Sequence, residues 1–184
     1  MAGGAARWAS SSPQSAQRFI ESQKIFFTAT AEAEGRVNLS PKGMDTLRVL
    51  SPNRVAWLAV TGSGNETSAH LARHDRITVM FCAFEGHPKI LRLYGRATPV
   101  HRHDPGWADL LAHFEELPGT RNIVDCEIDL VQTSCGMAVP YFDYVGERDD
   151  LQRWARKLGP EGLEAYWAEK NTVSLDGRPI TLPT

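Results

Sequence analysis

Two short stretches of the sequence carry residue types that bind anions. Residues 62–71 read GSGNETSAHL and follow an apolar segment. Gly62 and Gly64 allow backbone conformations that point successive N–H groups into one hollow. Side-chain donors are added by Ser63, Asn65 and Thr67. A helix beginning near Asn65 would direct its unpaired N–H groups to the same place, so the stretch suits a phosphate group.

The same stretch has a simpler interpretation as a turn with a helix cap. Asn65 or Ser63 after a glycine turn is a good capping residue. Glu66 adds a negative charge, which opposes a phosphate unless it points away. The Gly-Lys-Ser/Thr ending of a Walker loop is absent. Taken alone, residues 62–71 favour the capped turn.

A second polar stretch, VNLSPKG at 37–43, changes this balance. Alternate side chains of an extended strand share one face. That face would carry Asn38, Ser40 and Lys42. A hydroxyl and an ammonium group are the parts needed beside a phosphate, and Gly43 permits a close approach of the backbone. The alternative here is a solvated edge strand that turns at Pro41.

The segments around these stretches have mainly strand character. Aromatic and β-branched residues, separated by turn residues, predict strands at 24–31, 36–40, 45–50, 54–60, 76–84, 89–100 and 123–131. The alternation is clearest in the last segment, where acidic residues alternate with the apolar residues Val124, Cys126, Ile128 and Leu130. One face of this strand is therefore expected in the core and the other in water.

Helical patterns are fewer and shorter. We expect one helix at 66–74, one that begins at Asp104 and stops before Pro118, and one over 147–170 with a break at Gly159. Many strands, few helices and no strand–helix alternation predict a mainly β (α+β) fold built on an antiparallel barrel. The expected organisation is a disordered tail at 1–20, a barrel domain at 21–146 and a C-terminal helical extension packed on it at 147–184.

Composition narrows the class of protein. The 184 residues are 42% apolar and carry a net charge of −2, with no concentrated basic surface for nucleic acid. No run approaches the ~20 apolar residues of a membrane span. The opening residues lack the apolar core of a secretory signal, although their arginines leave an organelle-targeting role open. Three widely spaced cysteines fit reduced, mostly buried thiols in a cytoplasmic protein, and no spacing indicates a metal site.

The order of the segments resembles a known family. FFTATAEAEGRVNLSPKG, RVAWLAVTGSGNETSAHLARHDRITVMF and ILRLYGRA are similar to the FMN-binding split-barrel family related to pyridoxamine 5′-phosphate oxidase, over about residues 24–135. Its most specific pieces are NLSPKG, GSGNETSAHL and LYGRA. The resemblance implies a six-stranded antiparallel split barrel and a homodimer with FMN at the subunit interface.

The resemblance also implies which residues bind FMN. The family holds the phosphate with its second strand and with the loop that opens the short helix. The matching positions, with one on the strand near the flavin, are Ser40, Lys42, Gly43, Thr61, Gly62, Asn65, Glu66, Thr67 and Arg92. Oxidases of the family carry an Arg-Lys pair where this chain has Glu66 and Thr67. Lys42 is therefore expected to carry a larger share of the phosphate's charge.

The function expected from this resemblance is that of an FMN-dependent oxidoreductase acting on an unknown small molecule. The closing strand with which pyridoxamine 5′-phosphate oxidase grips its substrate, which contains Trp and Arg, has no match near the C-terminus, so that particular reaction is not expected. No motif specifies a catalytic acid or base. The alternative is a non-catalytic module that holds flavin or haem in the same barrel.

Overall fold

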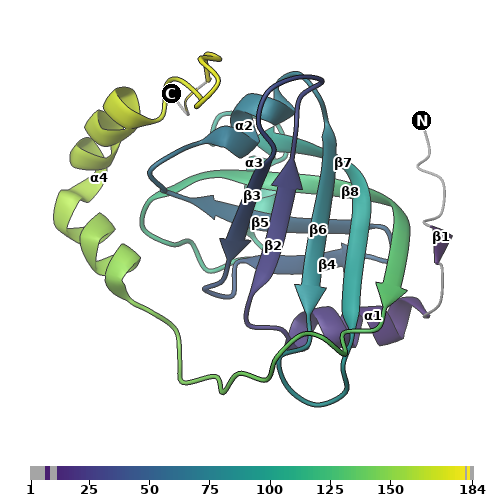
Figure 1. Ribbon diagram of the computed structural model, residues 1–184. Coiled ribbons are helices and arrows are strands. Elements are labelled where there is room, and N and C mark those ends of the chain that lie inside the picture. Colours follow the sequence, from purple (N-terminus) through teal and green to yellow (C-terminus); the bar gives the residue numbers. More distant parts are fainter. Residues whose placement is uncertain (1–6, 9–11, 181, 183–184) are drawn as a thin grey trace.

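The computed structural model describes residues 7–8, 12–180 and 182 (Figure 1). The strands are β1 (Arg7–Trp8), β2 (Phe26–Thr30), β3 (Asn38–Lys42), β4 (Leu47–Ser51), β5 (Arg54–Val60), β6 (Arg76–Cys82), β7 (Ile90–Val100) and β8 (Thr120–Ser134). Seven of them pair antiparallel in the order β3-β2-β6-β7-β8-β5-β4, and β1 pairs parallel to β8. The antiparallel fold expected from the sequence is confirmed, with seven strands on this path in place of six.

The sheet curls around an apolar core, so that β4 and β5 cross behind β2 and β6 (Figure 1). Buried aromatic side chains from three strands meet inside. The ring of Phe26 lies 6.2 Å from that of Trp57, edge to face, and 6.0 Å from that of Phe81. Burial of such large apolar groups is a main driving force for folding. This packing fixes β2 and therefore also β3, whose Lys42 pairs directly with Phe26.

The long strand β8 follows the predicted alternation only in part. Three of the residues predicted to face the core are buried, namely Val124, Cys126 and Ile128. The register between β7 and β8 then shifts between Tyr94 and Gly95. Beyond the shift Val131 is buried, whereas Leu130, which was predicted to be, is half-buried. A β-bulge adds one residue to one strand and so exchanges the faces of the residues that follow.

Four helices complete the described chain, namely α1 (Pro13–Ser22), α2 (Glu66–Leu71), α3 (Trp107–Leu111) and α4 (Asp150–Lys170). α1 corrects part of the disordered tail expected at 1–20; residues 1–6 and 9–11 of that tail lie outside the described residues. Ser12 caps α1 by accepting a hydrogen bond from Ser15 N at 3.3 Å. Ala16 and Ile20, one helical turn apart, are buried in the core and hold α1 on the barrel.

α2 and α4 lie close to their predicted positions, whereas α3 ends at Leu111 and is much shorter than the helix predicted from Asp104 to before Pro118. α3 begins at Trp107, because the Asp104 carboxylate accepts from His101 N (2.7 Å) and closes a turn instead of capping the helix. α4 breaks at Gly159, where φ is 68°, as the sequence predicted. α4 stands beside the barrel, and the chain after it returns to the neighbourhood of α2 (Figure 1). Within the described part of the chain, no helix has the length and apolar character needed to cross a membrane.

Candidate anion-binding site

The polar side chains of β3 face the interior of the fold. The antiparallel register pairs Asn38 with Thr30, Ser40 with Thr28, and Lys42 with Phe26. Directly opposed residues of an antiparallel pair share a face. Since Thr28 and Thr30 are buried, the three polar residues of β3 line the inner side of the sheet.

A hydrogen-bonded network joins the two stretches that the sequence singled out. Asn38 Nδ2 donates to Thr67 Oγ1 (3.0 Å) and to Thr30 Oγ1 (3.2 Å). Asn38 Oδ1 accepts from Ser40 Oγ (3.0 Å). Thr30 Oγ1 in turn contacts Nδ1 of the buried His70 at 3.0 Å. β3 and α2, which are far apart in the sequence, therefore present one continuous polar surface.

Asn65 occupies the position of a helix cap without acting as one. It precedes α2, but its side chain makes no capping hydrogen bond. The residue is buried, and among the described residues its Nδ2 has no hydrogen-bond partner. Buried polar atoms in folded proteins are nearly always satisfied, so such an atom indicates an absent ligand or water. The capped-turn interpretation of residues 62–71 therefore does not account for this side chain.

Arg121, at the start of β8, is a candidate site residue that the sequence analysis missed. It is 6% exposed. Its Nη1 donates to Gly64 O (3.0 Å) and to Asn171 Oδ1 (2.6 Å), both uncharged acceptors. Its Nε has no partner, and no carboxylate of the described chain lies within 4 Å. Burial lowers the pKa of this guanidinium to about 10.

Lys42 and Arg121 are electrostatically coupled. Burial lowers the pKa of the Lys42 ammonium, and the positive charge of Arg121 lowers it further. Within the described residues Lys42 also lacks a carboxylate partner. Two buried charges of the same sign without a counter-ion are unfavourable, and an anion placed beside them removes that cost. Arg121 thus supplies a second cation close to the polar surface formed by β3 and α2.

The remaining residues inferred from the family resemblance lie in two groups. Thr61 and Gly62 hold the C-terminal helix: Thr61 Oγ1 accepts from Trp167 Nε1 (2.8 Å), and Gly62 O accepts from Asn171 Nδ2 (3.3 Å). Arg92 lies elsewhere. It pairs with Met80 on the outer face of the sheet and donates to Ser134 Oγ at 3.0 Å. The structure therefore does not bring Arg92 to the inner face that carries Lys42.

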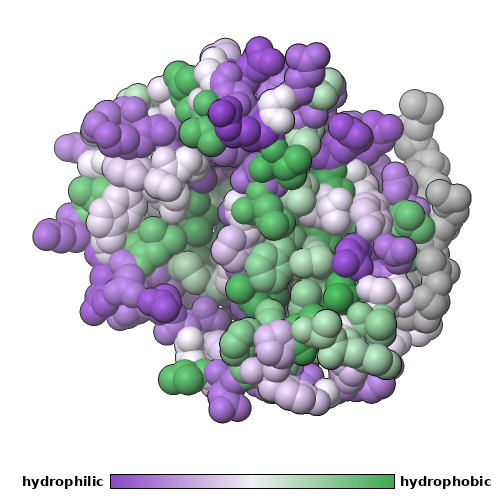
Figure 2. Space-filling model, viewed as in Figure 1, coloured by the Kyte–Doolittle hydropathy of each residue, from purple (hydrophilic) through white to green (hydrophobic). Residues whose placement is uncertain are grey.

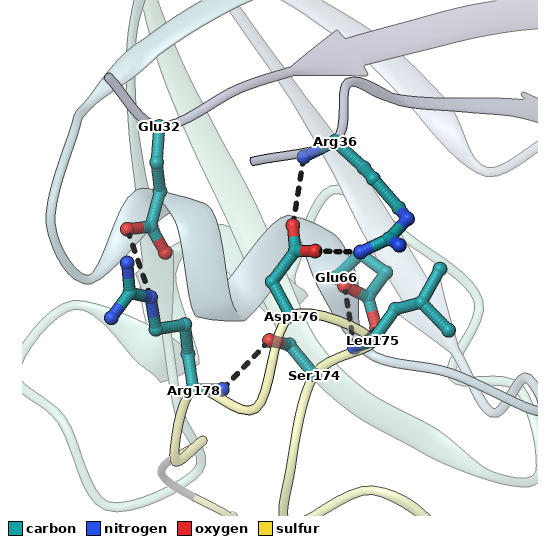
Figure 3. Close-up of polar contacts among 7 residues, drawn as sticks. All are labelled: Glu32, Arg36, Glu66, Ser174, Leu175, Asp176 and Arg178. Atoms are coloured by element: carbon teal, nitrogen blue, oxygen red, sulfur yellow. Dashed lines mark hydrogen bonds and ion pairs between the residues drawn. The ribbon is translucent and has the colours of Figure 1, made fainter. Parts of the chain in front are cut away.

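Glu66 is turned away from the two cations. Both of its carboxylate oxygens accept from Leu175 N, at 3.0 and 3.2 Å (Figure 3). Leu175 belongs to the segment that follows α4 and packs against α2. The Glu66 carboxylate, whose charge was expected to oppose a phosphate, is therefore hydrogen-bonded to the C-terminal segment.

A groove of about 1180 Å³ opens at the Lys42 end of β3, on the outer face of the sheet, where Phe27 pairs with Pro41. Lys42 and Gly43 form part of its wall, together with the start of β2, the 142–148 segment and the start of α4. Its apolar lining includes Phe27, Met44, Phe84, Phe142, Tyr144 and Leu151. The surface is hollowed between α4 and the barrel, with hydrophobic residues along the hollow (Figure 2). The groove thus has aromatic walls, and its charged lining residues are of both signs: Lys24, Lys42 and Arg148, and Glu85, Asp143, Glu147 and Asp150.

The turn at the edge of this groove has an unusual backbone. Met44 and Asp45 have φ angles of 62° and 51°, a region that residues other than glycine rarely occupy. Glu147 secures the turn, because its carboxylate accepts from Met44 N (3.2 Å) and from Tyr144 Oη (2.8 Å). Strain of this kind persists where the surrounding structure holds it, commonly at functional sites.

The fold and the site together define a split-barrel protein with two electrostatically coupled buried cations and an aromatic groove. Residues 12–135 match the family described as pyridoxamine 5′-phosphate oxidase. The pyridoxamine 5′-phosphate oxidase family protein ustO of Aspergillus flavus is 36% identical over 175 residues, covering 85% of this chain and 70% of that protein. The chain belongs to the pyridoxamine 5′-phosphate oxidase family.

Solved structures share the fold at low sequence identity. HupZ of Group A Streptococcus superimposes with a TM-score of 0.51 at 16% identity, over 64% of this chain and 90% of that one. A protein of Clostridium acetobutylicum related to general stress protein 26, of the pyridoxinephosphate oxidase family, gives a TM-score of 0.53 at 14% identity, over 67% and 87% of the two chains. These likenesses concern the fold alone.

Proposed function

We propose that this protein is an FMN-binding flavoprotein whose phosphate site is formed by Lys42 and Arg121. The observation that carries the proposal is the pair of buried cations without a carboxylate partner in the described chain. A phosphate group carries close to two negative charges at neutral pH and three acceptor oxygens. It satisfies both cations at once, and charge-assisted hydrogen bonds of this type are the strong ones.

The uncharged groups around the cations suit the same ligand. Asn65 Nδ2 and Arg121 Nε are buried donors without a partner in the described structure. The Thr67 hydroxyl accepts from Asn38, which leaves its own proton to donate. α2 has six residues, so its dipole contributes little, and the side chains supply most of the attraction. Lys42, Arg121, Asn65 and Thr67 are accordingly assigned to the phosphate.

The groove beside Lys42 is assigned to the flavin ring and to a small substrate. Ligand pockets are mostly apolar clefts of about 300–1000 Å³ with a few polar groups that fix orientation. The aromatic walls suit a planar ring, and about 1180 Å³ leaves room for a second molecule. When bound, the flavin supplies the hydride or electron chemistry of an oxidoreductase. The chain binds it, orients it and excludes water.

A cytoplasmic homodimer is the proposed working form. Val37 and Leu39 are 70% and 63% exposed, on the loop before β3 and on β3 itself. Phe142 and Val145 of the 142–148 segment are 60% and 98% exposed. Exposed apolar side chains gathered on neighbouring segments are typical of interaction surfaces. A second copy that covers Phe142 would also cover part of the groove, which this side chain lines.

Titration with FMN and with riboflavin tests the proposed function, because the two ligands differ only in the phosphate. The purified protein is expected to bind FMN more tightly than riboflavin by at least about tenfold, which corresponds to about 1.4 kcal/mol. Quenching of flavin fluorescence reports both affinities. Equal affinity for the two ligands would exclude a phosphate site at Lys42 and Arg121.

A further inference from the structure

The C-terminal segment forms a compact turn that is fastened to the barrel. Gly177 N donates to Ser174 O (2.9 Å), and Arg178 N donates to Ser174 Oγ (3.0 Å). Leu175 is therefore the second residue of a four-residue β-turn. We call residues 174–178 the C-terminal turn; it precedes Ile180, which is buried.

Ion pairs on both sides hold the C-terminal turn in place (Figure 3). The Asp176 carboxylate accepts from Arg36 N (2.8 Å) and pairs with the Arg36 guanidinium. Arg178 Nε lies 3.5 Å from Glu32 Oε2. Arg36 and Glu32 belong to the loop between β2 and β3. The turn is thus fixed against the loop that leads into the strand of Lys42.

The C-terminal turn also determines where the Glu66 carboxylate points. Leu175 N is its hydrogen-bond donor, and in the described chain no cation lies within 4 Å of it. The carboxylate lies beside Gly64: a Cβ atom added there would be 3.7 Å from Glu66 Oε1. Gly64 O is the atom that accepts from Arg121. Gly64 therefore lies between the Glu66 carboxylate and the Arg121 guanidinium, which has no carboxylate partner in the described chain.

We propose that the C-terminal turn controls ligand affinity by holding Glu66 away from Arg121. This inference rests on the proposed function, since the ligand that gains is the phosphate of FMN. When Leu175 N binds the carboxylate, Arg121 has no counter-ion and attracts an anionic ligand. When the turn is released, Glu66 becomes an internal counter-ion that competes with the phosphate. Leu175 is a positioning residue through its backbone N–H.

The substitution Leu175→Pro removes this N–H and leaves the rest of the turn intact. Proline is favoured at the second position of a β-turn, and the Leu175 side chain is 73% exposed, so little packing is lost. Leu175→Ala is the matched control because it keeps the N–H. We expect Leu175→Pro to bind FMN about five- to a hundredfold more weakly than Leu175→Ala, the usual range of coupling between two sites. Riboflavin affinity should be equal in the two variants.

A second variant separates this effect from structural damage. Glu66→Gln removes the competing charge, so Leu175→Pro should have no effect on FMN affinity when it is introduced into Glu66→Gln. Loss of FMN affinity from Leu175→Pro that persists in the Glu66→Gln background overturns the proposal. So does equal FMN affinity of Leu175→Pro and Leu175→Ala when the parent prefers FMN to riboflavin. A parent that does not distinguish FMN from riboflavin overturns the proposed function itself, and this inference with it.

Discussion

At the scale of single residues, the site is defined by charges that lack partners. A buried charge is costly unless it is paired, and the pKa of such a group shifts to favour the neutral form. The pKa values of Lys42 and Arg121 are both lowered in this way. Arg121 donates its hydrogen bonds to uncharged oxygens. A protein that keeps two such cations loses stability in the absence of ligand and gains affinity for an anion.

Substitution of Lys42 should therefore weaken FMN binding without lowering the stability of the ligand-free protein. Lys42→Met keeps the volume of the side chain and removes its charge. A charge-assisted contact is worth roughly 1.5–3 kcal/mol, so FMN affinity should fall roughly ten- to a hundredfold. The free energy of unfolding of the ligand-free protein should not fall, because a desolvated charge is removed. Fluorescence titration and urea unfolding measure the two quantities.

Thr67→Ala provides a comparison for Lys42→Met at the same surface. It removes a neutral hydrogen bond worth on the order of 1 kcal/mol, so FMN affinity should fall less than in Lys42→Met. Riboflavin affinity should change little in either variant. If Lys42→Met binds FMN as tightly as the parent does, Lys42 is not a phosphate partner.

The depressed pKa of Lys42 also predicts a pH dependence. An anion stabilises the ammonium form and so raises the pKa of Lys42 on binding. The attraction is complete below the pKa of the ligand-free protein and is lost as pH rises through the pKa of the complex. The ratio of FMN to riboflavin affinity should therefore fall with rising pH on the alkaline side, and the fall should begin at higher pH in Lys42→Arg. A ratio that stays constant up to pH values near 10, where Arg121 also titrates, would contradict the assignment.

At the scale of elements, the bulge between β7 and β8 sets which residues enter the core. Gly95 is at this point because the backbone of Glu127 on β8 passes too close for any side chain. The bulge exchanges the faces of β8, so that Val131 enters the core. The start of the same strand carries Arg121. β8 therefore carries the cation Arg121 near its start and apolar core residues such as Val131 further along.

Substitution of Gly95 should destabilise the barrel. In Gly95→Ala the new Cβ would collide with the Glu127 carbonyl, and the strands would have to separate. Overpacking of this kind costs typically about 1–3 kcal/mol. The control is Gly62→Ala, whose Cβ would meet only Gly64 O at an ordinary distance of 3.6 Å. Urea unfolding midpoints of the two variants measure the difference. Equal midpoints would show that the β7 backbone can shift to accept the new Cβ without a loss of stability.

At the scale of the whole molecule, the groove is a composite of segments distant in the sequence. The start of β2, the turn after β3, the 142–148 segment and α4 each supply part of its wall. Glu147 connects two of these parts, because it binds the turn at Met44 and the ring hydroxyl of Tyr144. Phe142, which lines the groove, and Leu39 on β3 are exposed apolar residues and belong to the proposed contact with a second copy.

Sedimentation should reveal a homodimer at micromolar concentration. Leu39→Glu places a charge on the outer side of β3, where the side chain is 63% exposed, and should shift the protein towards monomer. Its urea midpoint at low protein concentration should match that of the parent, since no core contact is lost. Ala108→Glu, on the exposed side of α3, is the control and should remain dimeric. A parent that sediments as a monomer would exclude this assembly.

The sequence by itself determined the barrel and the two polar stretches. Strand alternation and turn residues are local properties, so Phe26–Thr30, Arg54–Val60 and the break at Gly159 could be predicted from neighbouring residues. Only the tertiary structure revealed Arg121, because its lack of a counter-ion depends on what packs around it. It also decided the position of Glu66. That carboxylate is kept from the site by Leu175 N, more than a hundred residues away, and no local pattern specifies a contact of that range.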